Sequence, residues 1–346
     1  MTLTQALKKH IKNTKTFGDL AAAAGPIETA KRFAVHNPST GELLADLPDM
    51  RASDVALAID RADAVRELWA GLTARERSDI LWRWHQLIVD HIDDIAAILT
   101  CEMGKPLAEA KSEISHAAAY VQWYAEEANR IYGETIPAPS TDRRLLVIKQ
   151  PVGVVGAITP WNFPASMVAR KIAPALAAGC TVVLKPAEQT PLVAGAMFAL
   201  ARMAGFPEGV LNLIYASDGD AVGKELCSNS KVRKVSFTGS TEVGRLLMRQ
   251  CSEQIKRISF ELGGNAPFIV FDDADIDAAV DGAIQAKFRN GGQTCVSANR
   301  IYVQSGVYHL FSERFTERVR RLQVGDGFKS DTAIGPLIDT HALAKI

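Results

Sequence analysis

The chain has 346 residues, of which 47% are hydrophobic, and its 39 lysines and arginines balance 39 aspartates and glutamates. This composition is typical of a globular protein with two or three domains, and the absence of a basic excess argues against nucleic acid as a partner. No run approaches the roughly 18 uninterrupted apolar residues of a membrane helix.

The cellular compartment is indicated by the N-terminus and by the cysteines. The first residues, MTLTQALKKHIKNTK, contain lysines but no apolar run with a small-residue cleavage site, so a secretory signal is not expected. The five cysteines are odd in number and widely scattered, which favours reduced thiols and a cytoplasmic location. No spacing of histidines, cysteines or carboxylates suggests a metal site.

The first 130 residues are expected to be mainly helical. One helix is predicted to begin at Ser53, the expected N-cap, because apolar residues follow it at helical spacing through residue 70. A second is predicted over residues 74–102, ending before Gly104, and a third over 107–132.

From residue 145 the pattern changes to strands that alternate with helices. Such alternation predicts right-handed crossovers and a parallel, doubly wound α/β sheet, which binds ligands beyond the carboxyl ends of its strands. The predicted strands cover residues 152–158, 181–185, 210–214, 232–238 and 257–261, and the helices cover residues 163–178, 190–204, 218–228 and 242–252.

Polar and glycine-rich turns follow four of these strands. They are TPWNFP (159–164), KPAEQTP (185–191), GSTEVG (239–244) and ELGGN (261–265). Because carboxyl ends of parallel strands share one edge of a sheet, these turns are expected to converge there, which favours a nucleotide enzyme.

Two of the turns have both a nucleotide-binding and a structural interpretation. GSTEVG opens a helix after a strand, as phosphate-binding turns do, but Ser240 is equally suited to cap that helix. Lys185 and Glu188 end a buried strand, where they either bond a ribose or form a solvated rim.

The other two turns carry candidate catalytic groups. Asn162, between two prolines, either belongs to a structural loop or supplies an amide donor to a developing oxyanion. Glu261 is either an ion-paired structural residue or a general base, if burial raises its pKa towards neutrality.

Cys295 lies in RNGGQTCVSANR (289–300), among glycines and small polar residues. A structural cysteine usually sits among large apolar residues and stays inert. No histidine stands in a motif-like setting, so a cysteine hydrolase is disfavoured. A thiol, an amide donor, a carboxylate and a nucleotide crevice together fit aldehyde oxidation with hydride transfer to a nicotinamide.

These motifs, in this order and spacing, resemble the NAD(P)-dependent aldehyde dehydrogenase superfamily, and the likeness runs from about residue 30 to the end. The resemblance implies that Cys295 is the nucleophile, that Glu261 activates the deacylating water and that Asn162 forms the oxyanion hole. It implies that the dinucleotide is bound by Ile158, Trp161, Asn162, Lys185, Glu188, Gly239, Ser240 and Leu262.

The resemblance also implies a division into domains. A cofactor-binding domain is expected from residues 1–128 and 152–263, a bridging segment used in homo-oligomers from 129–151, and an α/β catalytic domain from 264–346. The chain stops at HALAKI without a helix terminator, so the catalytic domain is expected to be incomplete, with poor solubility and little activity for the chain alone.

Within the superfamily, the site most resembles succinate-semialdehyde dehydrogenases. Arg170 and Arg289 stand where that branch holds a distal carboxylate, although each arginine alone is typical of a surface charge. NAD is the expected cofactor, since Glu188 would repel a 2′-phosphate, with NADP as the alternative. A CoA-acylating aldehyde dehydrogenase and an inactive fragment are the alternative functions.

Overall fold

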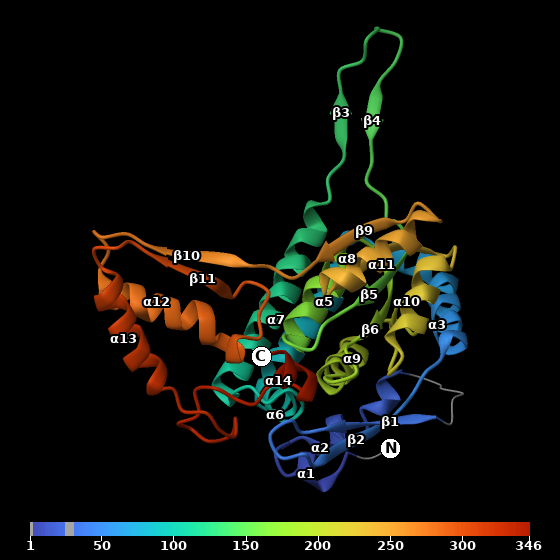
Figure 1. Cartoon of the computed structure of the whole chain (residues 1–346). Coiled ribbons are helices and arrows are strands. Elements are labelled where there is room, and N and C mark those ends of the chain that lie inside the picture. Colours follow the sequence, from blue (N-terminus) through green and yellow to red (C-terminus); the bar gives the residue numbers. More distant parts are fainter. Residues whose placement is uncertain (1–2, 25–30) are drawn as a thin grey trace.

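The protein is described by a computed structural model that covers residues 3–24 and 31–346 (Figure 1). Residues 1–2 and 25–30 of the predicted cofactor-binding domain lie outside the described residues. The centre of the fold is a parallel five-stranded sheet in the order β7-β6-β5-β8-β9, which confirms the predicted doubly wound α/β class. Its strands are β5 (Val154–Ile158), β6 (Thr181–Lys185), β7 (Leu211–Leu213), β8 (Val232–Thr238) and β9 (Arg257–Glu261).

Helices cover both faces of this sheet, because each parallel crossover carries one. The crossovers are α8 (Pro164–Ala177), α9 (Leu192–Ala204), α10 (Gly219–Ser228) and α11 (Thr241–Ser252). α10 and α11 pack on one face with α3 (Ala52–Ala64), and α8 and α9 pack on the other (Figure 1). The chain adds β6 and β7 on one side of β5 and then β8 and β9 on the other, so strand order reverses beside β5.

The helices that pack on the outer side of α8 and α9 do not all begin and end where the sequence predicted. The expected helix over 74–102 is two helices, α5 (Ala74–Asp90) and α6 (Ile92–Met103), which meet at His91. The following helix, α7 (Leu107–Glu127), packs along α5 and α8. Gly104 ends α6 with φ +88°, as predicted from the sequence.

The cap predicted at Ser53 is wrong. α3 begins at Ala52 and its N-cap lies two residues earlier than predicted, at Arg51, whose backbone N–H donates to the Asp54 carboxylate at 2.8 Å. The predicted helix also breaks at Val65, after which α4 (Arg66–Gly71) begins.

Smaller units surround the sheet. The N-terminal part holds α1 (Gln5–Lys8), α2 (Thr14–Phe17), the 3-10 turn η1 (Ala21–Ala24) and the antiparallel pair β1 (Arg32–His36) and β2 (Leu43–Pro48). After the turn η2 (Ala128–Arg130), β3 (Glu134–Ile136) and β4 (Leu145–Val147) form an arm that projects from the body (Figure 1).

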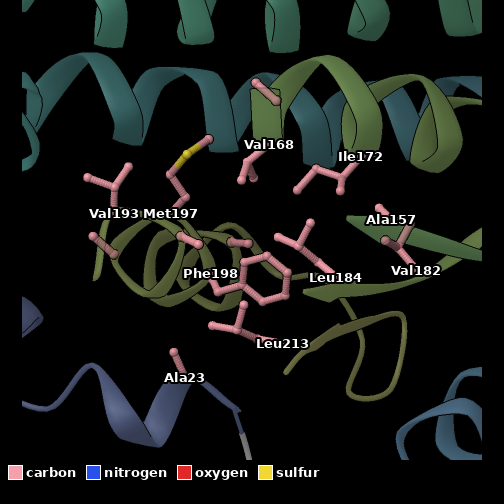
Figure 2. Close-up of a cluster of buried hydrophobic side chains, with 14 of the residues drawn as sticks. Ala23, Ala157, Val168, Ile172, Val182, Leu184, Val193, Met197, Phe198 and Leu213 are labelled. Atoms are coloured by element: carbon pink, nitrogen blue, oxygen red, sulfur yellow. The ribbon is translucent and has the colours of Figure 1, made fainter. Parts of the chain in front are cut away.

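The C-terminal part has its own small core. β10 (Ala266–Val270) runs parallel to β11 (Ala298–Val303), and α12 (Ile276–Phe288), the turn η3 (Arg289–Gly292) and α13 (Tyr308–Arg320) accompany them, with α14 (Thr340–Lys345) last. Val270, Val280 and Phe311 are buried in this cluster, apart from the main core. In the main core, Figure 2 shows Phe198 of α9 lying against Leu184 and Leu213 of the sheet.

One buried carboxylate joins the helical layer to α9. The two oxygens of Glu102, at the end of α6, accept hydrogen bonds from the Leu192 and Val193 N–H groups at 2.7 and 2.9 Å. These are orphan donors of the first turn of α9, so Glu102 acts as its cap from another helix. Burial raises the pKa of Glu102 to about 8, although the two N–H bonds favour its charged form.

We predict that Glu102 makes stability fall as pH rises. The pKa of Glu102 in the folded state lies above the value of about 4.3 in the unfolded state. The contribution of Glu102 to stability is therefore complete below about pH 4.3 and is lost as the pH rises towards 8. As pH rises from about 5 to about 8, the stability of Glu102→Gln relative to that of wild type should therefore increase by about 1–3 kcal/mol. Urea unfolding across this range measures the difference, with exposed Glu253→Gln as control. A difference that does not change with pH would contradict the prediction.

Candidate active site at the edge of the sheet

The cysteine loop, residues 289–297 between α12 and β11, contains three residues in left-handed backbone conformations. Asn290, Gly291 and Gly292 have φ values of 58°, 63° and 73°, so the chain turns sharply between α12 and β11. Two glycines and an asparagine are the residues that tolerate this backbone best. The turn leaves Cys295 exposed, whereas the other four cysteines are buried. The structure thus agrees with the interpretation of Cys295 as an accessible thiol.

A cleft of about 250 Å³ brings Cys295 together with the two predicted arginines. Arg170 comes from α8 and Arg289 from η3, and Tyr120 of α7 and Phe163 are among the other lining residues. The Tyr120 hydroxyl accepts a hydrogen bond from Arg170 Nε at 3.1 Å. The Arg289 guanidinium lies over the Phe163 ring at 5.3 Å. Both cations are therefore held by aromatic side chains and are not paired with carboxylates.

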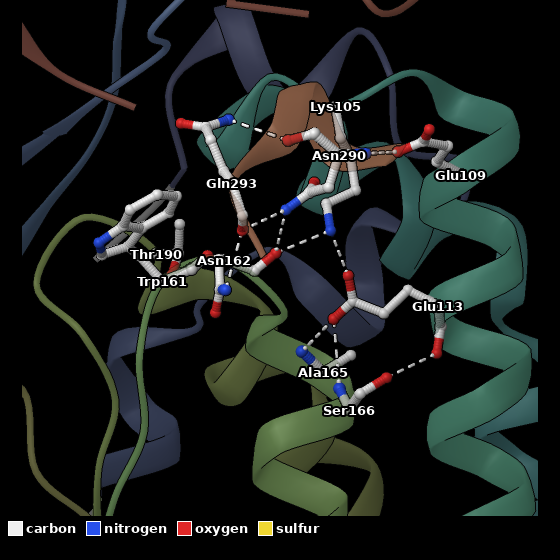
Figure 3. Close-up of polar contacts among 10 residues, drawn as sticks. All are labelled: Lys105, Glu109, Glu113, Trp161, Asn162, Ala165, Ser166, Thr190, Asn290 and Gln293. Carbon is white, nitrogen blue, oxygen red and sulfur yellow. Dashed lines mark hydrogen bonds and ion pairs between the residues drawn. The ribbon is translucent and has the colours of Figure 1, made fainter. Parts of the chain in front are cut away.

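Asn162 lies against the cysteine loop. Its side-chain Nδ2 donates to the Gln293 carbonyl at 2.9 Å, and its own carbonyl accepts from Lys105 Nζ at 2.9 Å and from Asn290 Nδ2 at 3.0 Å (Figure 3). The turn after β5 and the loop before β11 are thereby tied to each other.

Four residues of this network, Lys105, Glu113, Asn290 and Gln293, were not predicted from the sequence as site residues. For Lys105 the sequence predicted only that a helix ends before Gly104. Lysine is rarely buried, so nothing in the sequence indicated that Lys105 lies inside the protein.

A second cleft, of about 380 Å³, lies beside β5, where strand order reverses. This is the place where doubly wound sheets bind nucleotides. Six of the predicted dinucleotide contacts line it: Ile158, Trp161, Lys185, Glu188, Gly239 and Ser240. Leu262 is not among its lining residues and packs on Gly244 of α11, and Asn162 lies outside it.

The polar groups of this second cleft are already partly paired. Buried Lys185 bonds the half-exposed Glu188 carboxylate at 2.9 Å. Ser240 Oγ accepts from the Val243 N–H at 3.2 Å, so it does cap α11, and the helix N-terminus faces the cleft. The capping and the phosphate-binding interpretations are therefore compatible.

Glu261 lines a third groove, of about 460 Å³, together with Lys171 and Arg170. Only Arg170 is shared with the cleft of Cys295. Glu261 is exposed, so the structure does not show the burial on which the interpretation as a general base was conditional. Lys171 is buried and burial lowers its pKa to about 8, while the nearby charge of Glu261 acts in the opposite direction.

Two kinds of feature are absent from the described residues. Among residues 3–24 and 31–346, no group of three or more histidine, cysteine or acidic side chains could hold a metal ion. Over the same ranges no helix has the length and apolarity needed to cross a membrane.

A nucleotide-sized cleft at the reversal point of a parallel sheet, with an exposed thiol in a second cleft, is the arrangement expected of an oxidoreductase that binds a dinucleotide. Residues 27–346 match the family model described as the aldehyde dehydrogenase family. The chain belongs to this family.

Individual relatives are similar along nearly the whole chain. The probable succinate-semialdehyde dehydrogenase [NADP(+)] of Sinorhizobium fredii is 78% identical, and the alignment covers 100% of this chain and 71% of that protein. The succinate-semialdehyde dehydrogenase [NADP(+)] GabD of Escherichia coli is 58% identical over 90% of this chain and 64% of its own length. A crystal structure of succinate-semialdehyde dehydrogenase from Burkholderia pseudomallei matches with a TM-score of 0.94 and 50% identity, over 97% of this chain and 70% of that one.

Proposed function

We propose that the protein containing these residues oxidises succinate semialdehyde to succinate with NADP. The observation that carries the proposal is the single cleft in which Cys295 meets Arg170 and Arg289. A planar guanidinium binds a carboxylate through two parallel bonds, so two arginines beside a thiol suit an aldehyde with a distal carboxylate. The names of the Sinorhizobium and Escherichia relatives support the same substrate.

In this proposal Cys295 Sγ adds to the aldehyde carbon, and the Asn162 amide donates to the oxyanion that forms. A bound nicotinamide dinucleotide supplies a hydride acceptor. Glu261 then takes a proton from the water that hydrolyses the Cys295 thioester, which frees the thiol and the acid. A CoA-acylating reaction would need no such base, and the dehydrogenase names of the relatives do not favour it.

The second cleft suits a dinucleotide, because it joins glycine backbone, a helix N-terminus and a buried lysine. The expected preference for NAD is not supported, since the two relatives carry NADP(+) in their names. The Lys185–Glu188 ion pair offers a physical reason, because Lys185 offsets the charge that would repel a 2′-phosphate. We therefore assign NADP.

The domain roles follow the expected division. Residues 1–128 and 152–263 would form the cofactor-binding domain, and residues 264–346, with their separate core, the catalytic part. The arm formed by residues 129–151 would join copies of the chain in a homo-oligomer. The five unpaired cysteines suit a reducing, cytoplasmic setting.

The catalytic roles are tested by following NADP reduction with succinate semialdehyde. Cys295→Ala should abolish turnover, because it removes the nucleophile. Glu261→Gln should leave a burst of about one NADPH per site followed by slow turnover, because only deacylation is impaired. Higher kcat/KM with NAD would overturn the cofactor assignment, and loss of the burst would contradict the role of Glu261. An inactive wild type would favour the alternative of a non-catalytic fragment.

Arg289 is expected to read the distal carboxylate. Losing a charge-assisted bond costs about 1.5–3 kcal/mol, so Arg289→Ala should lower kcat/KM for succinate semialdehyde by roughly 10- to 100-fold. Butanal, which lacks the carboxylate, should be oxidised as by wild type. Arg320→Ala, on the exposed end of α13, is the matched control. Equal losses on both aldehydes would mean that Arg289 supports the loop and does not bind the substrate.

The arm is expected to be an interface. Leu146 and Ile148 are 70% and 66% exposed, and such apolar side chains on a projecting hairpin are typical of association surfaces. Replacing both with lysine should reduce the molar mass measured by light scattering, with Met203→Lys as an exposed control on α9. An unchanged oligomer, or a wild-type monomer, would contradict this role.

A further inference from the structure

A buried ion pair lies directly behind the cysteine loop. Lys105 Nζ contacts Glu113 Oε2 at 2.5 Å, and both side chains are almost fully buried, at 1% and 2% exposure. The ammonium also lies 4.2 Å from the centre of the Phe163 ring. Burial lowers the pKa of Lys105, and the charge of Glu113 opposes that effect.

The pair connects three segments that are distant in the sequence. The other oxygen of Glu113 accepts from the Ala165 and Ser166 N–H groups at 2.9 and 3.2 Å, which are orphan donors at the start of α8. Lys105 itself donates to the Asn162 carbonyl at 2.9 Å. Figure 3 shows the ammonium between the carboxylate of α7 and the turn that carries Asn162.

The same Asn162 carbonyl is also held from the cysteine loop. Asn290 Nδ2 donates to it at 3.0 Å, and Asn162 Nδ2 donates to the Gln293 carbonyl at 2.9 Å. The Asn290 N–H in turn donates to Glu109 Oε2 at 2.9 Å. The Asn162 peptide is thus fixed from two sides, by Lys105 and by Asn290.

A purely structural role does not require this arrangement. Replacing a buried ion pair with apolar side chains of similar volume is often neutral or stabilising, because desolvation of the charges is costly. An apolar pair would pack α7 against α8 but would donate nothing to Asn162. The hydrogen bond to the Asn162 carbonyl depends on the ammonium of Lys105, which an apolar side chain cannot replace.

We propose that Lys105 is a positioning residue of the oxyanion hole, holding the Asn162 peptide so that its side-chain amide stays beside the cysteine loop. This inference rests on the proposed role of Asn162 in attack by Cys295. A preorganised donor loses much of its value when it is displaced by about 1 Å, so freeing the Asn162 peptide should slow acylation without changing which ligands bind.

Acylation of the protein that contains these residues by p-nitrophenyl acetate isolates this step. The Cys295 Sγ–acyl bond forms, the ester C–O bond breaks, p-nitrophenolate leaves and the thiol proton passes to solvent. The reaction needs no nicotinamide and no distal carboxylate, so it is independent of dehydrogenase activity and of the arginines. Cys295→Ala gives the background rate.

Lys105→Met should acylate about 10- to 100-fold more slowly than wild type, and Asn162→Ala about 100- to 1,000-fold more slowly, as for loss of an oxyanion donor. If Lys105 acts through Asn162, the double variant should be no slower than Asn162→Ala alone. A structural role would instead multiply the two effects and lower the affinity for NADPH, measured by its fluorescence.

Lys105→Met leaves Glu113 without its partner and could therefore fold poorly. Two further variants test the proposal in that case. Lys105→Met combined with Glu113→Gln removes both charges at similar volume, and Asn290→Gly removes the second donor while tolerating the left-handed backbone. Both should slow acylation and show the same non-additivity with Asn162→Ala. Acylation at the wild-type rate in these variants, or in Asn162→Ala, would overturn the proposal. Failure of NADP reduction with normal acylation would count against the dehydrogenase alone.

Discussion

All five strands of the central sheet run parallel, and this constraint places every functional turn at one edge. The turns after β5, β6 and β8 supply the lining of the nucleotide cleft, although up to 80 residues separate them in the chain. A parallel sheet also needs a helix in each crossover, and the first crossover delivers Arg170 to the neighbouring cleft through α8. The fold thus sets the cleft beside β5 and the cleft of Cys295 on two sides of the Trp161–Asn162 turn.

The position of Cys295 depends on contacts between its loop and other segments of the chain. Cys295 lies in an irregular loop, and such a loop is precise only where other elements hold it. Gln293 does this in three directions, since its carbonyl accepts from Asn162 and Asn290 and its side-chain oxygen accepts from the Ile338 N–H at 3.0 Å. Gly264 approaches from β10, and a side chain there would meet the Cys295 carbonyl at 2.6 Å. Gly263 is less restricted, since a Cβ there would meet Thr241 Oγ1 at 3.7 Å, an ordinary van der Waals distance.

The sequence was sufficient for features that depend on local periodicity. The strand predicted over 181–185 matches β6, and the four crossover helices differ by one or two residues, because apolar runs and glycine or proline boundaries are local signals. The break at His91 was missed, since residues 74–102 contain neither glycine nor proline. Lys105 and Asn290 were missed because their partners lie 57 and 128 residues away, and no period in the sequence reports such a contact. The exposure of Glu261 also depends on what covers β9 in space.

The acidic and the basic side chains around Cys295 have different kinds of partner. Glu109 and Glu113 both line it, but their oxygens are directed at main-chain donors, Glu109 at the Asn290 N–H and Glu113 at the start of α8. These main-chain hydrogen bonds satisfy carboxylate oxygens that are buried or partly buried. Arg170 and Arg289, in contrast, rest on the faces of Tyr120 and Phe163, whose π-systems orient a guanidinium without neutralising it. The two acids therefore hold the surrounding loops in position, whereas neither arginine forms a salt bridge with a carboxylate of the described residues, as the proposed recognition of an anionic substrate requires.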